Sequence, residues 1–477
     1  MLSMVFIFNF TSAKPTHQLL AVSCYLLTFN FLYAIFMPMN KLDEHLIKQI
    51  SKERGEPGWM LDRRLAAFDS WKKMPEPHWA DVIYDRIDYD ALNYFNKPMP
   101  VDNSDLAATY DKMGLPEAEK RALLGMATDL VIDSQSVNTS YQEELKKHGI
   151  IFLPMQDAVR QHPDLVKKYF GTVVSGTDNF FAALNMAVFS DGTFVYIPPG
   201  VKCPIDLASY FRIETDKIGQ FERTLIIADE GSELSYMEGC SAPRRTKHQL
   251  HSGVVEVIAM KGATVKYATV QNWATNIYNF VSKRAVLHEN SKVYWTQIEV
   301  GSAKTWKYPS SILKGSGAFS DFYSLSITRG DQQADTGTKM IHLAPGTKSN
   351  ILSFGIALEN SVQTFRSLVK FNAEDCTNVS NCDSKIIENR ESRNEKRTDS
   401  RINTLPTFES AHKGDYTHEA KTGVLDAAGM LYLNAAGIPD DEASALLVAG
   451  IASPVLKRLP MEFLVESKQL IQLALAK

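Results

Sequence analysis

The chain has 477 residues, of which 22% are charged and 44% are hydrophobic, and its formal net charge is −4. This length allows two or three structural units, and the composition is that of an ordinary globular protein. The slightly acidic balance argues against a nucleic-acid binder, and five sparse cysteines argue against a disulfide framework and for a reducing compartment.

The first 38 residues are an apolar extension, and residues 19–37 are almost entirely apolar. Such a segment fits a membrane span, a targeting sequence, or residues upstream of a translation start at Met37 or Met39. The extension has no strongly basic start and no clear cleavage site, and helix-forming sequence begins at Asn40. We therefore favour a start at Met37 or Met39 and expect no membrane association, with a membrane anchor as the alternative.

Residues 39–175 are predicted to form an N-terminal helical region. Apolar residues recur at three- and four-residue spacing in residues 42–50 and 59–68, as on one face of a helix. The segment Gly55-Glu56-Pro57 separates the two and predicts a break between two helices.

Residues 176–385 are predicted to be the core, because they have strand character and an internal repeat. A Gly or Asn at a turn is followed five positions later by a large or aliphatic residue, and successive copies are 31, 28, 27 and 29 residues apart. The five pairs are Gly231/Tyr236, Gly262/Tyr267, Asn290/Trp295, Gly317/Phe322 and Gly346/Ile351. Polar residues alternate with β-branched and aromatic ones around the turns. A period of this length predicts a mainly β fold, a β-solenoid with about two strands per repeat.

The ends of this core are also marked in the sequence. Two apolar runs around an Asp-Gly turn, in residues 187–198, predict a hairpin or a solenoid corner. Residues 386–416 are predicted to be a charged loop and connector, because residues 388–401 contain no apolar side chain. Residues 417–477 are predicted to be a C-terminal helical region.

Motifs of common enzyme classes are absent from the sequence. The chain has no P-loop, and residues 344–349 (Ala-Pro-Gly-Thr-Lys-Ser) lack the leading Gly of that motif. His418-Glu419 begins like a zinc-protease motif, but Thr422 stands where the second His is needed. No Gly-x-Ser-x-Gly elbow is present. Hydrolase and nucleotidase functions are therefore not expected.

Several segments, in matching order along the chain, resemble one protein family. They are Gly55-Glu56-Pro57-x-Trp59-Met60-Leu61, residues 181–192, Tyr210-Phe211-Arg212-Ile213, Glu238-Gly239-Cys240-x-Ala242-Pro243, Val270-Gln271-Asn272-Trp273, residues 277–284, Thr305-Trp306-Lys307-Tyr308-Pro309, residues 332–342, Cys382-Asp383-Ser384 and His418-Glu419-Ala420. The chain resembles the SufB/SufD family of the SUF iron–sulfur cluster assembly system, on the SufB side. The resemblance covers roughly residues 40–477.

The resemblance implies a right-handed parallel β-helix core flanked by helical regions, and an assembly scaffold rather than an enzyme. It implies a complex with two copies of the ATPase SufC and one of the paralogue SufD, which accounts for the missing P-loop. Sulfur is expected as persulfide from a cysteine desulfurase and its sulfur-transfer protein. A nascent iron–sulfur cluster is then passed to recipient apo-proteins. Whether a reduced flavin supplies electrons stays open. The implied compartment is the cytoplasm, with the plastid stroma as the alternative.

The resemblance also assigns roles to individual residues. Cys240 matches the cysteine that accepts sulfur, and Cys382 matches the cysteine at which the cluster nucleates. His418 and Glu419 match candidate iron ligands beside Cys382. The positions that match a sulfur path through the β-helix are Arg212, Gln271, Trp273 and Lys283.

The chemistry of these residue types agrees with those roles. Persulfide transfer needs a thiolate, thiolates are favoured next to cations, and three cations follow Cys240 in the sequence. They are Arg244, Arg245 and Lys247. Cluster iron takes thiolate sulfur first and then imidazole or carboxylate, and Cys382, His418 and Glu419 supply one of each.

The sequence departs from the family pattern near Cys382. Ser400 stands where a second cysteine is usual, Thr417 replaces a common Glu, and the charged loop 388–401 is longer than usual.

Two other functions fit parts of the pattern: a SufD-like structural paralogue without sulfur chemistry, and a β-helix enzyme acting on polysaccharides. The motifs around Cys240 and Cys382 argue against the first, and the lack of a cluster of acids argues against the second.

Overall fold

The computed structural model describes most of the chain. The described residues are 41–94, 125–133, 135–213, 219–242, 248–387, 400–459 and 461–475. The apolar extension 1–38 and the basic residues Arg244, Arg245 and Lys247 lie outside these ranges. Within them, no helix is both long enough and apolar enough to cross a membrane.

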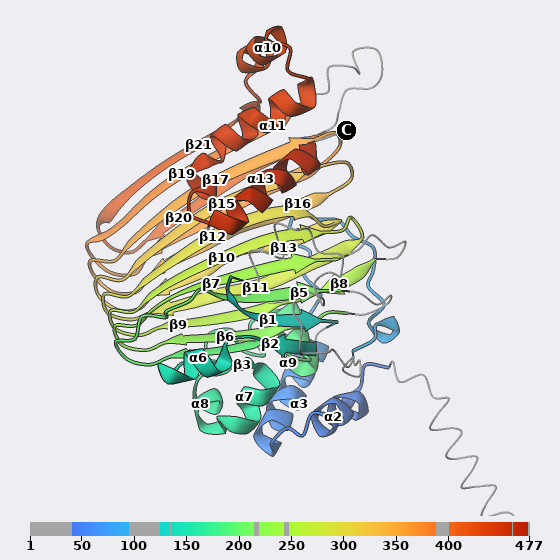
Figure 1. Ribbon diagram of the computed structural model, residues 1–477, viewed down its shortest axis with the longest axis vertical. Helices are drawn as coiled ribbons and strands as arrows, with labels where there is room; N and C mark the ends of the chain where they lie inside the picture. Colours follow the sequence, from blue (N-terminus) through green and yellow to red (C-terminus); the bar gives the residue numbers. More distant parts are fainter. Residues whose placement is uncertain are drawn as a thin grey trace, which may run out of the picture.

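The body of the molecule is a parallel β-solenoid of about six turns, which confirms the predicted fold class (Figure 1). Strands make up 44% of the structure and helices 25%. Most turns contribute one strand to each of two facing sheets. The pairings between the described strands are parallel, apart from the antiparallel pairs β1–β2 and β3–β4.

The strands of each sheet follow one another in sequence order along most of the stack. The first sheet has the order β2 (Gln135–Thr139), β1 (Ala127–Ile132), β5 (Leu207–Arg212), β7 (Glu233–Ser241), β10 (Thr264–Trp273), β12 (Lys292–Gly301), β15 (Phe319–Thr328), β17 (Lys348–Leu358), β19 (Cys376–Ile387) and β21 (Gly414–Val424). The second has the order β20 (Arg401–Ser410), β18 (Val362–Phe371), β16 (Gln333–His342), β13 (Lys304–Lys307), β11 (Ile277–Leu287), β9 (Val254–Ala259), β6 (Arg223–Ala228), β4 (Thr193–Ile197) and β3 (Ile151–Pro154). Two short strands join the second sheet, β8 (Gln249–His251) on β11, and β14 (Ser310–Leu313) on β11 and β16.

The repeat predicted from the sequence is confirmed as one column of buried side chains. In register, Tyr236, Tyr267, Trp295, Phe322 and Ile351 lie on successive strands of the first sheet. Neighbouring rings pack closely, with centroid distances of 5.2 Å and 5.1 Å for the first two pairs. The Gly or Asn five residues before each member has a φ between 56° and 69°. Gly and Asn adopt this left-handed conformation most readily, so the turn residue and the core residue recur together.

Helices close one end of the solenoid (Figure 1). They are α2 (Glu44–Glu53), α3 (Gly58–Lys73), the 3-10 helix η1 (Tyr89–Ala91), α6 (Gln142–Lys147), α7 (Met155–Gln161), α8 (Pro163–Tyr169) and α9 (Phe180–Val188). All nine residues of α9 are buried, because the helix lies between α3 and the strands. Inside this region Arg64 of α3 forms a fully buried ion pair with Glu56, 2.6 Å apart.

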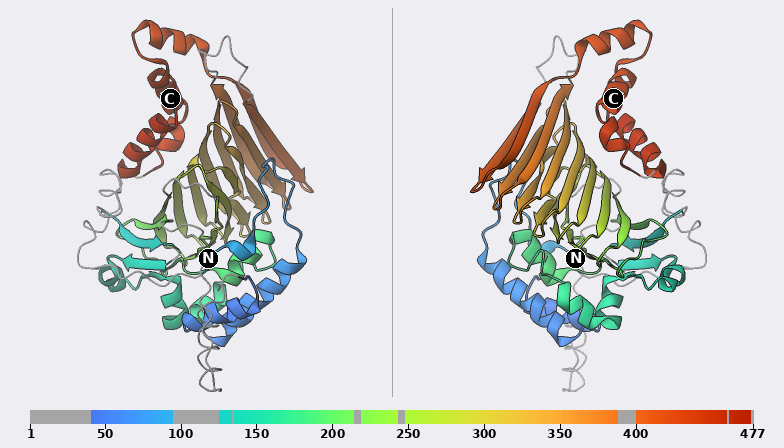
Figure 2. Two further views of the ribbon diagram at one scale, coloured as in Figure 1. Left: turned by 90° about the vertical axis from the view of Figure 1, so that its right-hand side faces the viewer. Right: turned by 90° about the vertical axis from the view of Figure 1, so that its left-hand side faces the viewer.

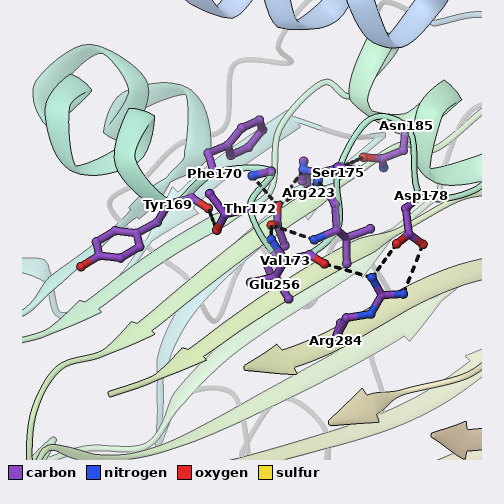
Figure 3. A network of polar contacts seen from close by, with 12 residues as sticks. Tyr169, Phe170, Thr172, Val173, Ser175, Asp178, Asn185, Arg223, Glu256 and Arg284 are labelled. Atoms are coloured by element: carbon purple, nitrogen blue, oxygen red, sulfur yellow. Dashed lines mark hydrogen bonds and ion pairs between the residues drawn. The ribbon is translucent and has the colours of Figure 1, made fainter. Parts of the chain in front are cut away.

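A buried carboxylate attaches the segment after α8 to the solenoid (Figure 3). Glu256 of β9 accepts hydrogen bonds from the backbone N–H groups of Gly171, Val173 and Val174 at 2.9–3.1 Å. Arg223 of β6 also donates to Glu256, at 2.8 Å from Nη2. Both carboxylate oxygens of Glu256 thus accept hydrogen bonds from the segment after α8, and Arg223 holds the carboxylate in place. These charge-assisted bonds join the helical end to the first turns of the solenoid.

The C-terminal helices run along one side of the stack (Figures 1 and 2). They are α10 (Ala427–Ala435), α11 (Asp440–Ile451), α12 (Ser453–Leu456) and α13 (Met461–Leu475). Val448 and Val455 of these helices belong to the same apolar cluster as Ile298 and Leu325, which point outward from the first sheet. Helix α10 lies at the end of the stack opposite the N-terminal helices.

The structure differs from the sequence-based expectation at both ends of the core. The solenoid continues beyond residue 385 through β20 and β21, where a connector and then helix were expected. Most side chains of these two strands are exposed, so they lack the buried apolar alternation that identifies a strand. At the other end, β1, β2 and β3 interrupt the region predicted to be helical. The first of the two apolar runs in residues 187–198 forms the end of helix α9 instead of a strand. A short buried apolar run is compatible with a helix as well as with a strand, so the sequence pattern did not distinguish them.

Candidate functional site

Cys240 lies inside the solenoid, near the end of β7. Residues 236, 238 and 240 point to the interior because side chains alternate along a strand. Cys240 is 2% exposed, and its sulfur is 3.8 Å from Glu238 Oε1 and 3.7 Å from the amide nitrogen of Gln271. Burial, together with the charge of Glu238, raises the pKa of Cys240 well above its usual value. The resting group is therefore a neutral thiol that donates toward Glu238 and accepts from Gln271.

The carboxylate beside Cys240 is held in its charged form by a buried lysine. Lys283 Nζ of β11 is 2.5 Å from Glu238 Oε1, and it also donates to Thr269 Oγ1 at 3.1 Å. Burial alone would raise the pKa of Glu238, but the charges of Lys283 and Lys307 and the hydrogen bonds lower it to about 2. A second buried ion pair, Lys307 with Glu299, follows two strands further along the stack. Charge is thus built into the interior and is paired there.

The structure brings three of the four predicted path residues to the Cys240 side of the interior. Gln271 contacts the sulfur directly, Trp273 packs in the same apolar cluster as Cys240, and Lys283 acts through Glu238. Arg212 is different, because it pairs in register with Ser241 and lies on the opposite face of the sheet. Its Nη1 is 3.3 Å from the Ser241 hydroxyl. The three basic residues that follow Cys240 in the sequence lie outside the described residues. Among the described residues, Lys283 is the cation in the hydrogen-bond network around Cys240.

A large cleft opens beside Cys240. Its volume is about 960 Å³, and its wall includes Arg212, Ser241 and Trp273 together with Tyr84 and Leu473. It lies where the segment after α3, the corners of the solenoid and α13 meet. Arg212 and Ser241 therefore stand in the wall of this cleft, and Ser241 directly follows Cys240 in the chain.

A column of polar side chains runs through the interior from the Cys240 end to Cys382. In register on successive strands of the first sheet, the polar column consists of Ser209, Glu238, Thr269, Gln297, Ser324, Ser353 and Cys382. Every member is at most 4% exposed. Ser324 donates to Ser353 at 2.9 Å, while the Gln297 amide has no partner among the described residues. With strands about 4.8 Å apart, Glu238 and Cys382 are separated by about 24 Å.

Cys382 has plainer surroundings than Cys240. It is 1% exposed, and burial alone raises its pKa from 9.0 to about 12. His418 of the last strand pairs in register with Ser380 and therefore faces the same interior. Both ring nitrogens of His418 lack a hydrogen-bond partner among the described residues, and partial burial lowers its pKa.

Glu419 is not on the same face as Cys382. It pairs with Asn381, points outward, and forms a 2.7 Å ion pair with Lys421. Across the described part of the chain, no three His, Cys, Asp or Glu side chains come together as a metal site. The proposed ligand set Cys382, His418 and Glu419 is therefore on two neighbouring strands but is not assembled within this chain.

Comparisons with known proteins agree with this architecture. The family model described as "SUF system FeS cluster assembly, SufBD core domain" matches residues 211–451, and "SufBD protein N-terminal region" matches residues 53–207. An iron–sulfur cluster assembly SufBD family protein of Synechocystis sp. is 44% identical, over 91% of this chain and 93% of its own length. A chloroplastic member from Arabidopsis thaliana is 42% identical, over 91% and 80%. One from Staphylococcus haemolyticus is 39% identical, over 92% and 94%.

Proposed function

The chain belongs to the SufBD family of iron–sulfur cluster assembly proteins, and from that premise we propose that it is the scaffold on which the cluster is built. In this proposal Cys240 accepts persulfide sulfur, the polar column carries sulfur through the solenoid, and Cys382 receives it where the cluster nucleates. The observation that supports this most is the polar column, because its seven buried members lie in register on successive strands and end at the thiol of Cys382. Buried polar groups are costly unless they are hydrogen-bonded, and the Gln297 amide has no partner among the described residues.

The first step is a transfer of sulfur between two thiols. The thiolate of Cys240 forms a bond to the outer sulfur of the donor persulfide, and the S–S bond of the donor breaks. The electron pair of that bond leaves on the donor sulfur, which takes up a proton equivalent to the one that Cys240 lost. Neither an external oxidant nor a reductant is needed. The donor is a cysteine desulfurase or its sulfur-transfer protein, and it reaches Cys240 through the cleft at Arg212 and Ser241.

The nucleation site is completed by a partner at the open end of the solenoid. The strands β20 and β21 end the stack with mostly exposed side chains, and exposed strands of this kind pair with another chain. We assign this end to a SufD paralogue, whose groups would complete the iron site with Cys382, His418 and Glu419. The cluster is cargo that passes to recipient apo-proteins.

ATP hydrolysis is assigned to SufC, since the sequence has no P-loop. Leu431 and Tyr432 of α10 and Leu446 of α11 are exposed, at 66%, 76% and 48%, beside the open end. An exposed apolar helix surface suits recognition in a groove of a partner. Closure of two SufC subunits would then move these helices and open the interface around Cys382.

The role is that of a scaffold rather than an enzyme, in the cytoplasm or the plastid stroma, and an electron supply from reduced flavin remains part of the hypothesis.

A SufD-like structural role without sulfur chemistry is the second candidate. It would leave the buried pair of Glu238 and Lys283 beside Cys240 without a purpose, although burying two charges is costly. We therefore favour the sulfur-accepting scaffold.

Obstruction of the polar column tests the proposed path. Ser324→Leu and Ser353→Leu place an apolar side chain in it, whereas Ser353→Ala removes only the hydroxyl. After loading by the desulfurase system, mass spectrometry should find persulfide on Cys240 in all three variants. Sulfur on Cys382 should be lost in the Leu variants and kept in the Ala variant. Normal loading of Cys382 in both folded Leu variants would show that sulfur takes another route.

A further inference from the structure

A chain of four side chains leads from Cys240 away from the polar column and ends at a buried carboxylate. Gln271 Nε2 lies 3.7 Å from the Cys240 sulfur, and Asn279 Nδ2 lies 2.7 Å from Gln271 Oε1. His251 Nδ1 is 2.7 Å from Asn279 Oδ1, and its Nε2 is 2.9 Å from Glu222 Oε2. The links come from three separate turns of the solenoid, and each of these residues, Cys240 included, is at most 3% exposed.

The direction of the hydrogen bonds in this chain depends on the charge of His251. When both ring nitrogens carry a proton, His251 donates to Glu222 and to the Asn279 carbonyl oxygen. The Asn279 amide must then donate to Gln271, and Gln271 must point its own N–H at the sulfur. A neutral imidazole with its proton on Nε2 accepts at Nδ1, so both amides turn over and the Gln271 oxygen faces Cys240. The proton on Nδ1 sets the direction: with it the Gln271 N–H faces the sulfur, and without it the Gln271 oxygen does.

The surroundings of His251 favour the charged form. Burial alone would lower the pKa of His251, but the charge and hydrogen bond of Glu222, the Asn279 hydrogen bond and the charge of Glu238 outweigh it and raise the pKa. Glu222, Glu238 and Lys283 are the charged groups that line the small cavity next to the ring. Trp273, whose ring centroid is 4.7 Å away, and Asn279 are its uncharged neighbours.

We propose that Glu222, His251 and Asn279 are positioning residues, which form a relay that holds the N–H of Gln271 toward Cys240. An N–H donor stabilises the anionic sulfur that forms when Cys240 attacks a persulfide and again when it carries one. A carbonyl oxygen at the same place would destabilise it. The relay therefore compensates in part for the burial that disfavours the Cys240 thiolate. This inference rests on the proposed role of Cys240 as sulfur acceptor, but it concerns the intrinsic reactivity of the thiol.

One isosteric substitution reverses the relay without removing its shape. Asn279→Asp presents only acceptors, so Gln271 must turn its N–H toward residue 279 and its oxygen toward Cys240. The matched control is Asn276→Asp, which adds the same charge in the same turn, where Asn276 contacts Gln249 rather than the relay.

The readout is the rate at which methyl methanethiolsulfonate modifies Cys240 between pH 6 and 10, followed by mass spectrometry. We expect Asn279→Asp to react at least about tenfold more slowly at pH 8, the effect of one pKa unit. Asn276→Asp should stay within about twofold of the unmodified protein, and Cys203, outside the relay, serves as an internal reference. A rate and a pH profile of Asn279→Asp within twofold of the unmodified protein would overturn the relay.

A second measurement is made on the unmodified protein. After labelling with ¹⁵N-histidine, the His251 resonances, assigned by their loss in folded His251→Gln, should show a protonated Nδ1 at pH 7. An unprotonated Nδ1 at that pH would refute the proposal. Persulfide loading separates this test from the proposed function. Without loading of unmodified Cys240, the scaffold function fails even if the reactivity follows the relay. Normal loading with unchanged reactivity in Asn279→Asp rejects the relay alone.

Discussion

Cys240 and Cys382 face the same solenoid interior but have opposite surroundings. Around Cys240 the chain supplies an amide donor, a carboxylate and a lysine, all buried and all hydrogen-bonded. Around Cys382 burial is the one influence that shifts its pKa, and one of the two neighbouring strands, β21, is the last of the first sheet.

This difference indicates that the two ends of the solenoid have different roles. The closed end, covered by the N-terminal helices, contains a buried thiol whose polar partners come from its own chain. The open end holds a thiol whose proposed co-ligands for iron, Glu419 included, are not gathered around it. We interpret the first as a complete acceptor and the second as half of a site that a partner completes.

Cys382→Ser should have the largest effect, because it removes the thiolate that cluster iron needs at the open end. We expect cluster assembly to be abolished in a cell that depends on this pathway, with an unchanged circular dichroism spectrum. Cys376→Ser is the control, since Cys376 is equally buried but hydrogen-bonds to Thr347 and to backbone carbonyls at a corner. Full activity of Cys382→Ser would contradict the assignment.

The isolated chain should keep Cys382 unreactive. Burial raises its pKa from 9.0 to about 12, so at pH 8 its thiolate fraction is about a thousandfold below that of an ordinary thiol. Alkylation of Cys382 should accelerate about tenfold per pH unit as the pH rises toward 12, and it should change once the SufD partner binds. Differential alkylation of the native and the unfolded chain measures this. Equal rates in both states at pH 8 would refute the comparison.

At the closed end, Lys283→Met should cost about 3–5 kcal/mol of unfolding free energy, because Glu238 is left as an unpaired buried charge. The double variant Glu238→Gln/Lys283→Met should recover most of that loss. At the open end, Ser353→Ala should cost about 1 kcal/mol, the value of one neutral hydrogen bond. Urea unfolding of the four proteins gives the comparison, and similar losses for Lys283→Met and Ser353→Ala would remove the distinction between the ends.

A charge on the helices beside the open end should have a smaller effect than the loss of Lys283. Leu446→Glu alters a side chain that is 48% exposed, whereas Leu447 packs against the C-terminal apolar cluster and is less suitable. We expect SufC to bind about tenfold more weakly, the equivalent of about 1.4 kcal/mol, with the solenoid intact by circular dichroism. An unchanged affinity in Leu446→Glu and Leu431→Glu would place the ATPase elsewhere.

The sequence predicted the parts of this molecule that repeat locally. The spacing of Gly231/Tyr236 and its four equivalents predicted the column, because a left-handed turn and a buried side chain recur together in each repeat. The last turn was not predicted. Its strands are exposed, so they carry no buried alternation to recognise.

The pairing of Glu238 with Lys283 was also out of reach, because the two are 45 residues apart and meet only once the register is known. A signal for Glu238 was nevertheless present. It stands between Tyr236 and Cys240 at interior positions of one strand, where period-two alternation calls for an apolar residue. A charge at such a position indicates a paired interior site. The roles of Arg212, Gln271, Trp273 and Lys283 came from the family resemblance alone.

The order of sulfur labelling tests the division between the two cysteines most directly. The protein in complex with the SufC and SufD partners that we propose is loaded with labelled sulfur by the desulfurase system, and both thiols are followed by mass spectrometry over time. Sulfur should appear first on Cys240 and later on Cys382. Cys240→Ser should abolish labelling of both sites, whereas Cys382→Ser should leave the label on Cys240. Direct labelling of Cys382 in Cys240→Ser would contradict the account.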